Sequence, residues 1–219
     1  MARAVVVGAG IFGVSAALAF RRRGAEVTLA SPGPVPHPLA ESTDISKIVR
    51  LDYGDDELYT SLMERALERW RDWPELHETG VLFVTRGAMQ KGSFEDDSAA
   101  LLERRGHRVE RLDANAIARR FPAWNASVWN GGYFNPQGGW AESGAVVARL
   151  AAEARDAGVT IATSAVASLV ERGTRVCGVR LGDGVTIEAD RVVLCVGSWT
   201  GHLVPPLASV LVSVGQPVF

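Results

Sequence analysis

The sequence has little net charge, little cysteine and almost no lysine. Its 23 basic and 25 acidic residues leave a formal charge of −2 over 219 residues. The chain therefore lacks the basic surface expected of a protein that binds nucleic acid or an anionic membrane. The two cysteines, Cys177 and Cys195, form neither a metal-ligand spacing nor a disulfide framework. This predicts a cytoplasmic protein without a metal site. Lys47 and Lys91 are its two lysines, so a lysine is the exception in an arginine-rich chain.

The N-terminal region also lacks the features of a targeting or membrane-spanning segment. The uncharged run Val5–Phe20 has 16 residues, fewer than a membrane span needs, and glycines interrupt it. Three arginines follow this run, whereas a signal peptide carries its positive charge in front, and no small-x-small cleavage site is evident beyond them. We interpret the run as a buried strand and a helix, and we expect no membrane partner.

What the sequence does contain is typical of a soluble globular protein. Hydrophobic residues make up 47% and charged residues 22%, and the length suits one large domain or two small ones. Short β-branched runs predict strands at residues 3–7, 26–30, 81–85, 159–162, 166–171, 176–181, 185–189 and 192–196. Amphipathic or alanine-rich segments predict helices at residues 14–23, 55–73, 99–105, 113–120 and 142–157. Between them we expect a polar loop at 86–98 and strand and turns at 124–140, and we expect Asp113 to be an N-cap.

A glycine motif, GAGIFG, lies between the first strand and the first helix at residues 8–13. Gly8 permits a tight turn, Gly10 allows backbone N–H groups to approach a pyrophosphate, and Gly13 allows the helix to pack closely against the strand. The N-terminus of the helix adds partial positive charge. We therefore expect Gly8, Gly10, Ile11, Phe12 and Gly13 to bind a dinucleotide rather than to form a merely structural turn.

The second strand ends without the acid that usually binds a ribose. In this type of fold a carboxylate about 20 residues after the glycine motif accepts hydrogen bonds from the ribose hydroxyls. Ser31 stands at that position, and its uncharged hydroxyl predicts weaker binding. The three-stranded meander over residues 166–189 and the apolar strand after it favour FAD. A nicotinamide dehydrogenase, which the missing acid favours, is the weaker alternative.

Six short segments resemble one class of flavoproteins. They are GAGIFG (8–13), DISKIVRLDYG (44–54), TGVLFV (79–84), GGWAES (138–143), DRVVLCVGSW (190–199) and QPVF (216–219). Together they make residues 3–219 similar to the glycine/D-amino-acid-oxidase class of FAD-dependent oxidoreductases, in the branch that holds sarcosine, N-methyltryptophan and fructosyl-amine oxidases. The resemblance implies an α/β fold. Its Rossmann-like FAD-binding domain would combine a parallel sheet with a three-stranded β-meander, beside part of a mainly antiparallel substrate-binding domain.

The resemblance also implies where the domains divide. It assigns residues 1–79 and 140–203 to the FAD-binding domain, and residues 80–139 and 204–219 to an incomplete substrate-binding domain. Members of this class are normally longer, and their C-terminal part completes the substrate-side sheet and supplies the cysteine that anchors the flavin. We therefore expect a truncated product, a fragment, or one subunit of a split enzyme whose second chain supplies the C-terminal half.

Two basic residues three positions apart carry the predicted chemistry. In the sarcosine-oxidase pattern such residues lie beside the flavin and the substrate carboxylate, and they match Lys47 and Arg50 here. The resemblance implies that Arg50 clamps a carboxylate bidentately and that Lys47 places positive charge near the flavin. The alternative is that both are solvated loop charges.

Further residues match the family by their position. Ser42 and Thr43 match loop positions near the cofactor, and Val166 matches a residue whose backbone meets the adenine. Gly197 and Trp199 match a turn beside the flavin, although packing of Trp199 in the core is an equal alternative. Neither cysteine matches the one that anchors the flavin, so both are expected to be small buried hydrophobic residues.

These inferences predict an FAD-dependent oxidoreductase, or its N-terminal part. It would oxidise the C–N bond of a secondary amine or amino acid to an imine that hydrolyses, with oxygen accepting the electrons to give hydrogen peroxide. The expected partner is a small amine or amino acid. The alternative is a non-catalytic FAD-binding fragment or subunit of a split amine oxidase.

Overall fold

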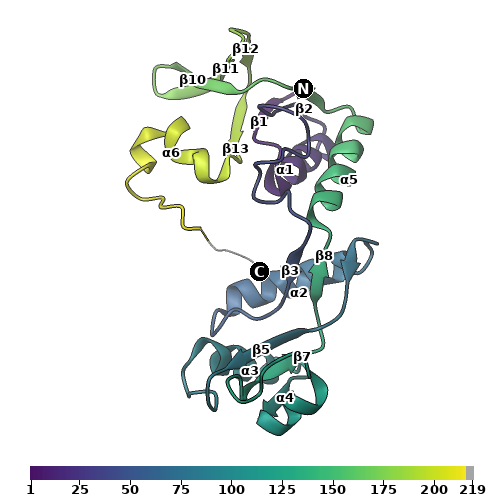
Figure 1. Ribbon diagram of the computed structural model, residues 1–219. Coiled ribbons are helices and arrows are strands. Elements are labelled where there is room, and N and C mark those ends of the chain that lie inside the picture. Colours follow the sequence, from purple (N-terminus) through teal and green to yellow (C-terminus); the bar gives the residue numbers. More distant parts are fainter. Residues whose placement is uncertain (216–219) are drawn as a thin grey trace. The chain divides into compact units, whose positions relative to one another are not determined.

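A computed structural model describes residues 1–215 of the chain (Figure 1). The QPVF segment, on which the resemblance partly rests, lies outside the described residues. The chain divides into two compact units. Unit 1 comprises Met1–Ile45 and Ser143–Phe219, and unit 2 comprises Ser46–Glu142. Unit 2 is therefore one continuous insertion between the two segments of unit 1.

Unit 1 is built on a four-stranded parallel sheet of order β13-β1-β2-β9. Figure 1 labels β13, β1 and β2 of this sheet. Its strands are β1 (Arg3–Val7), β2 (Glu26–Ala30), β9 (Thr160–Ala162) and β13 (Arg191–Leu194). β1 pairs in parallel with both β2 and β13 and is almost entirely buried, as expected for a β-branched run inside a parallel sheet. β1 and β2 have the predicted bounds.

Two helices accompany this sheet. α1 (Ile11–Arg22) connects β1 to β2 and contacts α5 (Ser143–Asp156), which precedes β9. α1 begins three residues before the predicted start, because Gly13 lies inside the helix rather than in the loop. Two arginines lie in its last turn, where the helix dipole favours cations, and Gly24 follows with a φ of +82°.

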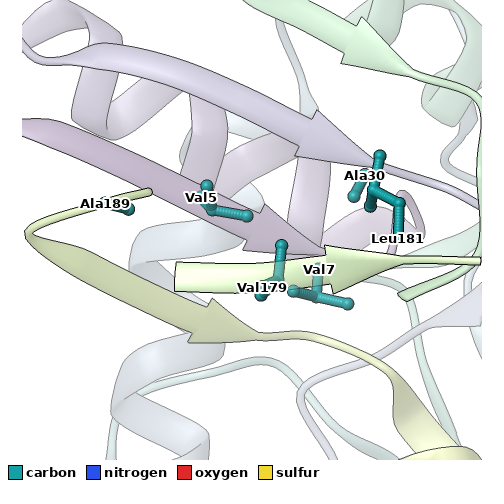
Figure 2. Close-up of a cluster of buried hydrophobic side chains, with 6 residues drawn as sticks. All are labelled: Val5, Val7, Ala30, Val179, Leu181 and Ala189. Carbon is teal, nitrogen blue, oxygen red and sulfur yellow. The ribbon is translucent and has the colours of Figure 1, made fainter. Parts of the chain in front are cut away.

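The predicted meander is confirmed as a separate antiparallel sheet in unit 1. It consists of β10 (Val166–Arg172), β11 (Arg175–Leu181) and β12 (Thr186–Glu188). A buried cluster joins it to the parallel sheet, and its members are Val5, Val7, Ala30, Val179, Leu181 and Ala189 (Figure 2). The two sheets thus share one core. After β13 the chain continues through η1 (Gly197–Trp199), α6 (Thr200–Leu203) and η2 (Pro205–Leu207).

Unit 2 contains two three-stranded antiparallel sheets, of order β3-β8-β4 and β5-β7-β6. The first consists of β3 (Lys47–Val49), β4 (Leu76–His77) and β8 (Gly139–Ala141). The second consists of β5 (Val81–Thr85), β6 (Glu110–Asp113) and β7 (Gly131–Asn135). β5 has the predicted bounds. β4 and β6 escape prediction because the first has two residues and the second is mostly charged.

The helices of unit 2 are α2 (Glu57–Trp70), α3 (Phe94–Arg104) and α4 (Ala114–Arg120). Asp56, Ser93 and Asp113 cap them in turn, each by accepting a hydrogen bond from the backbone N–H three residues on. The predicted cap at Asp113 is confirmed. α3 begins at Phe94, so the predicted polar loop is wrong in its last five residues. The Ser93 cap and three acidic residues in the first turn favour a helix there.

The compact units do not follow the predicted domain boundaries. β3 and β4 both pair with β8, which groups residues 46–79 with the rest of unit 2, whereas the described residues after 203 group with unit 1. Which residues form functional domains stays a prediction. The α/β fold class, with a parallel sheet and a meander beside an antiparallel part, is confirmed. Among residues 1–215, no helix combines the length and apolar character that crossing a membrane requires.

Candidate cofactor and substrate site

The glycine motif forms a tight turn between β1 and α1. Gly8 has a φ of +95°, a backbone conformation that favours glycine. A Cβ atom at Gly8 would collide with the carbonyl oxygen of Cys195, and one at Gly13 would collide with the carbonyl oxygen of Gly8. The path of the chain itself therefore requires both glycines.

Gly10 differs from these two glycines. Its φ of −74° is one that any residue adopts. The nearest atom to an added Cβ would be Ser42 Oγ at 3.1 Å, a side-chain atom rather than backbone. The backbone at Gly10 is thus not packed against other backbone, as expected where a pyrophosphate approaches.

The N-terminus of α1 offers backbone hydrogen-bond donors. Ser42 Oγ accepts a hydrogen bond from the amide of Ile11 at 3.0 Å, and the first amide bonded within the helix is that of Val14. Because an α-helix leaves its earliest amides without internal partners, Phe12 and Gly13 supply donors for an outside acceptor. The first turn contains no acidic residue, so the helix dipole gives this end a positive potential.

Two buried hydroxyl groups in unit 1 have no hydrogen-bond partner in the described part of the chain. Ser31, directly after β2, is 1% exposed, and its Oγ is unpartnered, as is Oγ1 of Thr43. A buried hydroxyl without a partner is costly and uncommon, so each marks a place where a bound molecule would add a hydrogen bond. Together with the glycine turn and the free amides of α1, these hydroxyls fit a dinucleotide such as FAD.

The other predicted contacts in unit 1 lie on two further elements. Val166 begins β10, and Gly197 begins η1 with a φ of +51° and accepts a hydrogen bond from Thr200 Oγ1 at 2.6 Å. Trp199 is 48% exposed, so it is not part of the core of unit 1 in the described residues. Contact of these residues with the cofactor stays a prediction.

Arg50 follows β3 in unit 2, and its guanidinium lies among three aromatic rings. Its Cζ is 5.3 Å from the ring centroid of Tyr53, 5.6 Å from that of Phe83 and 5.5 Å from that of Phe94. These distances are within the range of cation–π attraction. A ring contact of this kind uses none of the hydrogen-bonding capacity of the guanidinium N–H groups. Within residues 1–215 the Arg50 side chain makes no hydrogen bond or ion pair, so those N–H groups can bind a carboxylate.

Lys47, the second predicted basic residue, is the first residue of β3 and is paired with Ala141 of β8. It is exposed, whereas Arg50 is half-buried against its rings. Arg50 is therefore not a fully solvated loop charge. That Lys47 and Arg50 face one cavity stays a prediction.

Sequence reasoning missed a buried polar cluster close to Arg50 in the chain. The carboxylate of Asp52 is fully buried and accepts hydrogen bonds from the Tyr133 hydroxyl at 2.8 Å and from Asn135 Nδ2 at 3.2 Å. Burial raises the pKa of Asp52, and these two hydrogen bonds oppose the rise. The one sign of this cluster in the sequence was an acidic residue among the hydrophobic residues of the segment IVRLDY.

The two cysteines are free thiols. Both are partly rather than fully buried, which corrects the expectation of small buried residues. Cys177 Sγ donates a weak hydrogen bond to the Val170 carbonyl at 3.4 Å, and burial raises the pKa of the Cys195 thiol. Cys195 thus acts near the glycine turn through its backbone rather than through a reactive thiolate.

Unit 2 also contains an open hollow of about 590 Å³ beside β6, α4 and β7. Arg111, Arg119 and Met89 are among its lining residues, and none of the predicted site residues lines it. Arg111 is already bound to Asp96 and Glu103. We assign this hollow no part in the candidate site.

Nearly the whole sequence matches the model of one protein family. The model described as "FAD dependent oxidoreductase" matches residues 3–218. The chain belongs to this family. FAD is accordingly its cofactor, and family membership favours FAD over the nicotinamide alternative.

Curated relatives of this family member include N-methyl-L-tryptophan oxidases. The chain is 26% identical over 207 residues to an N-methyl-L-tryptophan oxidase of Salmonella arizonae, and 26% identical over 214 residues to one of Escherichia coli O157:H7. Each match covers 93% of this chain and 55% of the relative. The chain therefore spans about half the length of the curated relatives that it matches.

Solved structures of similar proteins share the fold. NikD, described as an unusual amino acid oxidase essential for nikkomycin biosynthesis, superposes with a TM-score of 0.76 and 28% identity, over 94% of this chain and 55% of NikD. Fructosamine oxidase (Amadoriase II) of Aspergillus fumigatus gives a TM-score of 0.77 and 26% identity, over 92% of this chain and 50% of that one. This flavoprotein fold is thus present over nearly all of the chain.

Proposed function

We propose that this chain is part of a flavoenzyme that oxidises the C–N bond of a secondary amine or amino acid. The observation that carries the proposal is Arg50, an arginine whose guanidinium lies over three rings and makes no hydrogen bond or ion pair in the described residues. It occurs in a family whose curated relatives here are amine oxidases. In the net reaction the amine, oxygen and water give a carbonyl compound, the released amine and hydrogen peroxide.

Unit 1 would hold the cofactor. The amides of Phe12 and Gly13 would bind the pyrophosphate at the positive end of α1, with Gly8 and Gly10 shaping the approach. The hydroxyl of Ser31 would bond to the ribose in place of the usual carboxylate. FAD, when bound, supplies the acceptor for the hydride that leaves the carbon beside the nitrogen.

Unit 2 would bind the substrate. Arg50 would hold a carboxylate with two parallel N–H···O hydrogen bonds, a geometry that fixes orientation as well as position. Lys47 would add positive charge near the flavin. An amine that binds in its unprotonated form needs no acid or base from this chain, and we assign none.

The first experiment measures whether the chain retains FAD. The purified protein is mixed with FAD and desalted, and its visible absorption is recorded beside that of Gly10→Val and Gly182→Ala. A valine side chain at Gly10 would cover the approach to the α1 amides, whereas a Cβ at Gly182 meets only ordinary contacts. We expect flavin bands in the wild type and in Gly182→Ala, and their loss in a folded Gly10→Val. A colourless wild type would overturn the cofactor assignment.

The second experiment measures amine recognition. Under anaerobic conditions the flavin-bound protein is titrated with an N-methyl amino acid and with the matching amine that lacks the carboxylate. Arg50→Leu should weaken binding of the carboxylated ligand by about 10- to 100-fold, the value of hydrogen bonds to a charged group. Arg86→Leu is the matched control, because Arg86 also stacks on a ring of unit 2, that of Trp129 at 5.2 Å.

The outcomes separate the two candidate functions. Bleaching of the flavin by amines, with peroxide formed when air is admitted, supports the oxidase. A stable flavin spectrum that no amine changes supports the alternative, an FAD-binding piece that turns nothing over. If a second chain restores bleaching to that piece, it is one subunit of a split enzyme.

A further inference from the structure

A series of contacts leads from Arg50 to the buried carboxylate of Asp52. Phe83, which lies under the Arg50 guanidinium, stacks on Tyr133 with ring centroids 5.0 Å apart and planes 11° from parallel. The hydroxyl of Tyr133 then donates to Asp52 Oδ1 at 2.8 Å. Asp52 therefore reaches the ring beneath Arg50 through a single hydrogen bond and a single ring stack.

The surroundings of Asp52 are closed and well bonded. Asp52, Tyr133 and Asn135 are each 0% exposed. Asn135 uses its amide group on Asp52 and its Oδ1 to accept from the backbone N–H of Gln137 at 3.0 Å. The backbone N–H of Gly54 donates to Ser98 Oγ at 2.7 Å, which fixes the segment after Asp52 to α3. A satisfied buried network of this kind holds its members in one arrangement.

Burial of the Asp52 carboxylate as a charged group lowers the stability of the fold. A buried carboxylate costs free energy unless it is paired, and no ion pair to Asp52 is found within residues 1–215. The positive charge of Arg50 lowers the pKa of Asp52, so the two groups attract each other without touching. An apolar residue at this position would stabilise the fold at least as well as the carboxylate. We therefore ask which side chains the carboxylate holds in position.

We propose that Asp52 is a positioning residue for Arg50. Its hydrogen bond fixes the tilt of the Tyr133 ring, the stacked Phe83 ring follows that tilt, and the guanidinium is held with its N–H edges ready for a carboxylate. A role of this arrangement in substrate binding rests on the proposed function of Arg50. The proposal that Asp52 orients the Arg50 side chain does not depend on that function.

The direct test measures the motion of the Arg50 side chain. In the full chain, arginine side-chain NMR gives the rate of rotation about the Nε–Cζ bond, and Arg50→Lys identifies the Arg50 signal. Tyr133→Phe keeps the ring but removes the hydroxyl, and Asp52→Asn keeps the shape but removes the charge. We expect the rotation to become several-fold faster in both variants. An unchanged rate in both would overturn the proposal.

The functional test uses the flavin-bound protein. The ratio of affinities for an N-methyl amino acid and its decarboxylated amine should fall on the order of 10-fold in Tyr133→Phe and Asp52→Asn. Adding Asp52→Asn to Arg50→Leu should cause no further loss. The control is Ile117→Val, a core substitution in α4 of the same unit, which should lower stability but leave the ratio unchanged.

The combined outcomes distinguish this proposal from the proposed function. Faster rotation in a protein that shows no preference for carboxylated ligands would support the positioning role and reject the oxidase assignment. In the opposite outcome, the preference for carboxylated ligands is lost in Arg50→Leu, but Tyr133→Phe and Asp52→Asn retain both the preference and the slow rotation. That outcome would support the oxidase assignment and reject the positioning role. If Asp52→Asn fails to fold, Tyr133→Phe decides, because it leaves the stacked ring in place.

Discussion

The candidate site residues of the two units are of different kinds. Unit 1 uses backbone and small residues: a turn of glycines, free amides and two hydroxyls, most of them within a few positions of one another. Unit 2 uses large side chains: an arginine among three rings, of which one follows β3 in the chain and the others lie on β5 and α3. A site made of backbone tolerates almost no added atom, whereas a site made of side chains depends on long-range packing. Substitutions should therefore affect the two units unequally.

The largest effect is expected from Gly13→Ala in unit 1. Alanine in place of glycine normally stabilises a helix, but here the new Cβ would collide with the carbonyl oxygen of Gly8. We expect a loss of about 3 kcal/mol or more in the free energy of unfolding, together with loss of FAD. Denaturant unfolding followed by circular dichroism measures it.

The control for that experiment is Gly182→Ala, also in unit 1, where the added Cβ meets one atom at an ordinary 3.6 Å. It should change the free energy of unfolding by less than about 1 kcal/mol. Equal effects of the two substitutions would mean that the tight packing at Gly13 is not what limits unit 1.

An intermediate effect, with a pH dependence, is expected in unit 2. Glu64 binds Arg105 at 2.6 Å and His107 at 2.7 Å, and the hydrogen bond from Arg105 is the main cause that lowers the pKa of Glu64 from 4.5 to about 2. A depressed pKa contributes stability above the unfolded value, and this is lost as the pH falls from 4.5 toward 2. Glu64→Gln should therefore cost about 1–2 kcal/mol at pH 7, and the deficit should shrink in acid.

Urea unfolding of the wild type and Glu64→Gln at neutral and acidic pH measures this difference. The matched control is Glu188→Gln in unit 1, whose bond to Arg172 joins two exposed side chains. It should change stability by less than about 0.5 kcal/mol at either pH. A deficit of Glu64→Gln that stays constant on acidification would contradict the pKa argument.

The smallest effect, and the one with an unusual sign, is expected for Ser31→Ala. Removing a buried hydroxyl that has no partner should stabilise the protein without FAD by about 1 kcal/mol. The same change should weaken FAD binding several-fold if the hydroxyl bonds to the ribose. Thermal unfolding without FAD and fluorescence titration with FAD measure the two effects. Thr43→Val is the parallel variant, and a loss of stability in both would show that the hydroxyls bond to water instead.

Elements of the fold that depend on neighbouring residues in the sequence were predicted better than those that depend on distant ones. β1 and β2 have their predicted bounds because a β-branched run between turn residues identifies a buried strand. The predicted helix at 99–105 starts later than α3, because the first turn of α3 is rich in charged residues and resembles a polar loop. The signal for its true start is the N-cap at Ser93. β4 and β6 are held by pairing with β8 and β7, partners distant in the sequence, so no local pattern could reveal them.

The same contrast holds for the site. The turn of residues 8–13 follows from its own glycines and is visible in the sequence. Arg50 was found through resemblance, but the rings around it were not, because Phe83 and Phe94 come close only once β5 and α3 are packed. The hydrogen bond between Asp52 and Tyr133 joins residues 81 positions apart, which no local pattern specifies.

The two segments that connect unit 1 to unit 2 in the chain, near residues 45 and 142, are hydrogen-bonded to each other. On one side Lys47 is paired with Ala141, and on the other the carbonyl of Asp44 accepts from the amide of Gly144 at 3.1 Å and from Ser143 Oγ at 3.0 Å. Residues 46–142 thus enter and leave through adjacent strands, the arrangement in which an inserted module can be exchanged. A short turn in their place would join the two segments of unit 1 directly. Unit 1 can therefore be engineered to receive segments of other sequence at the same junction.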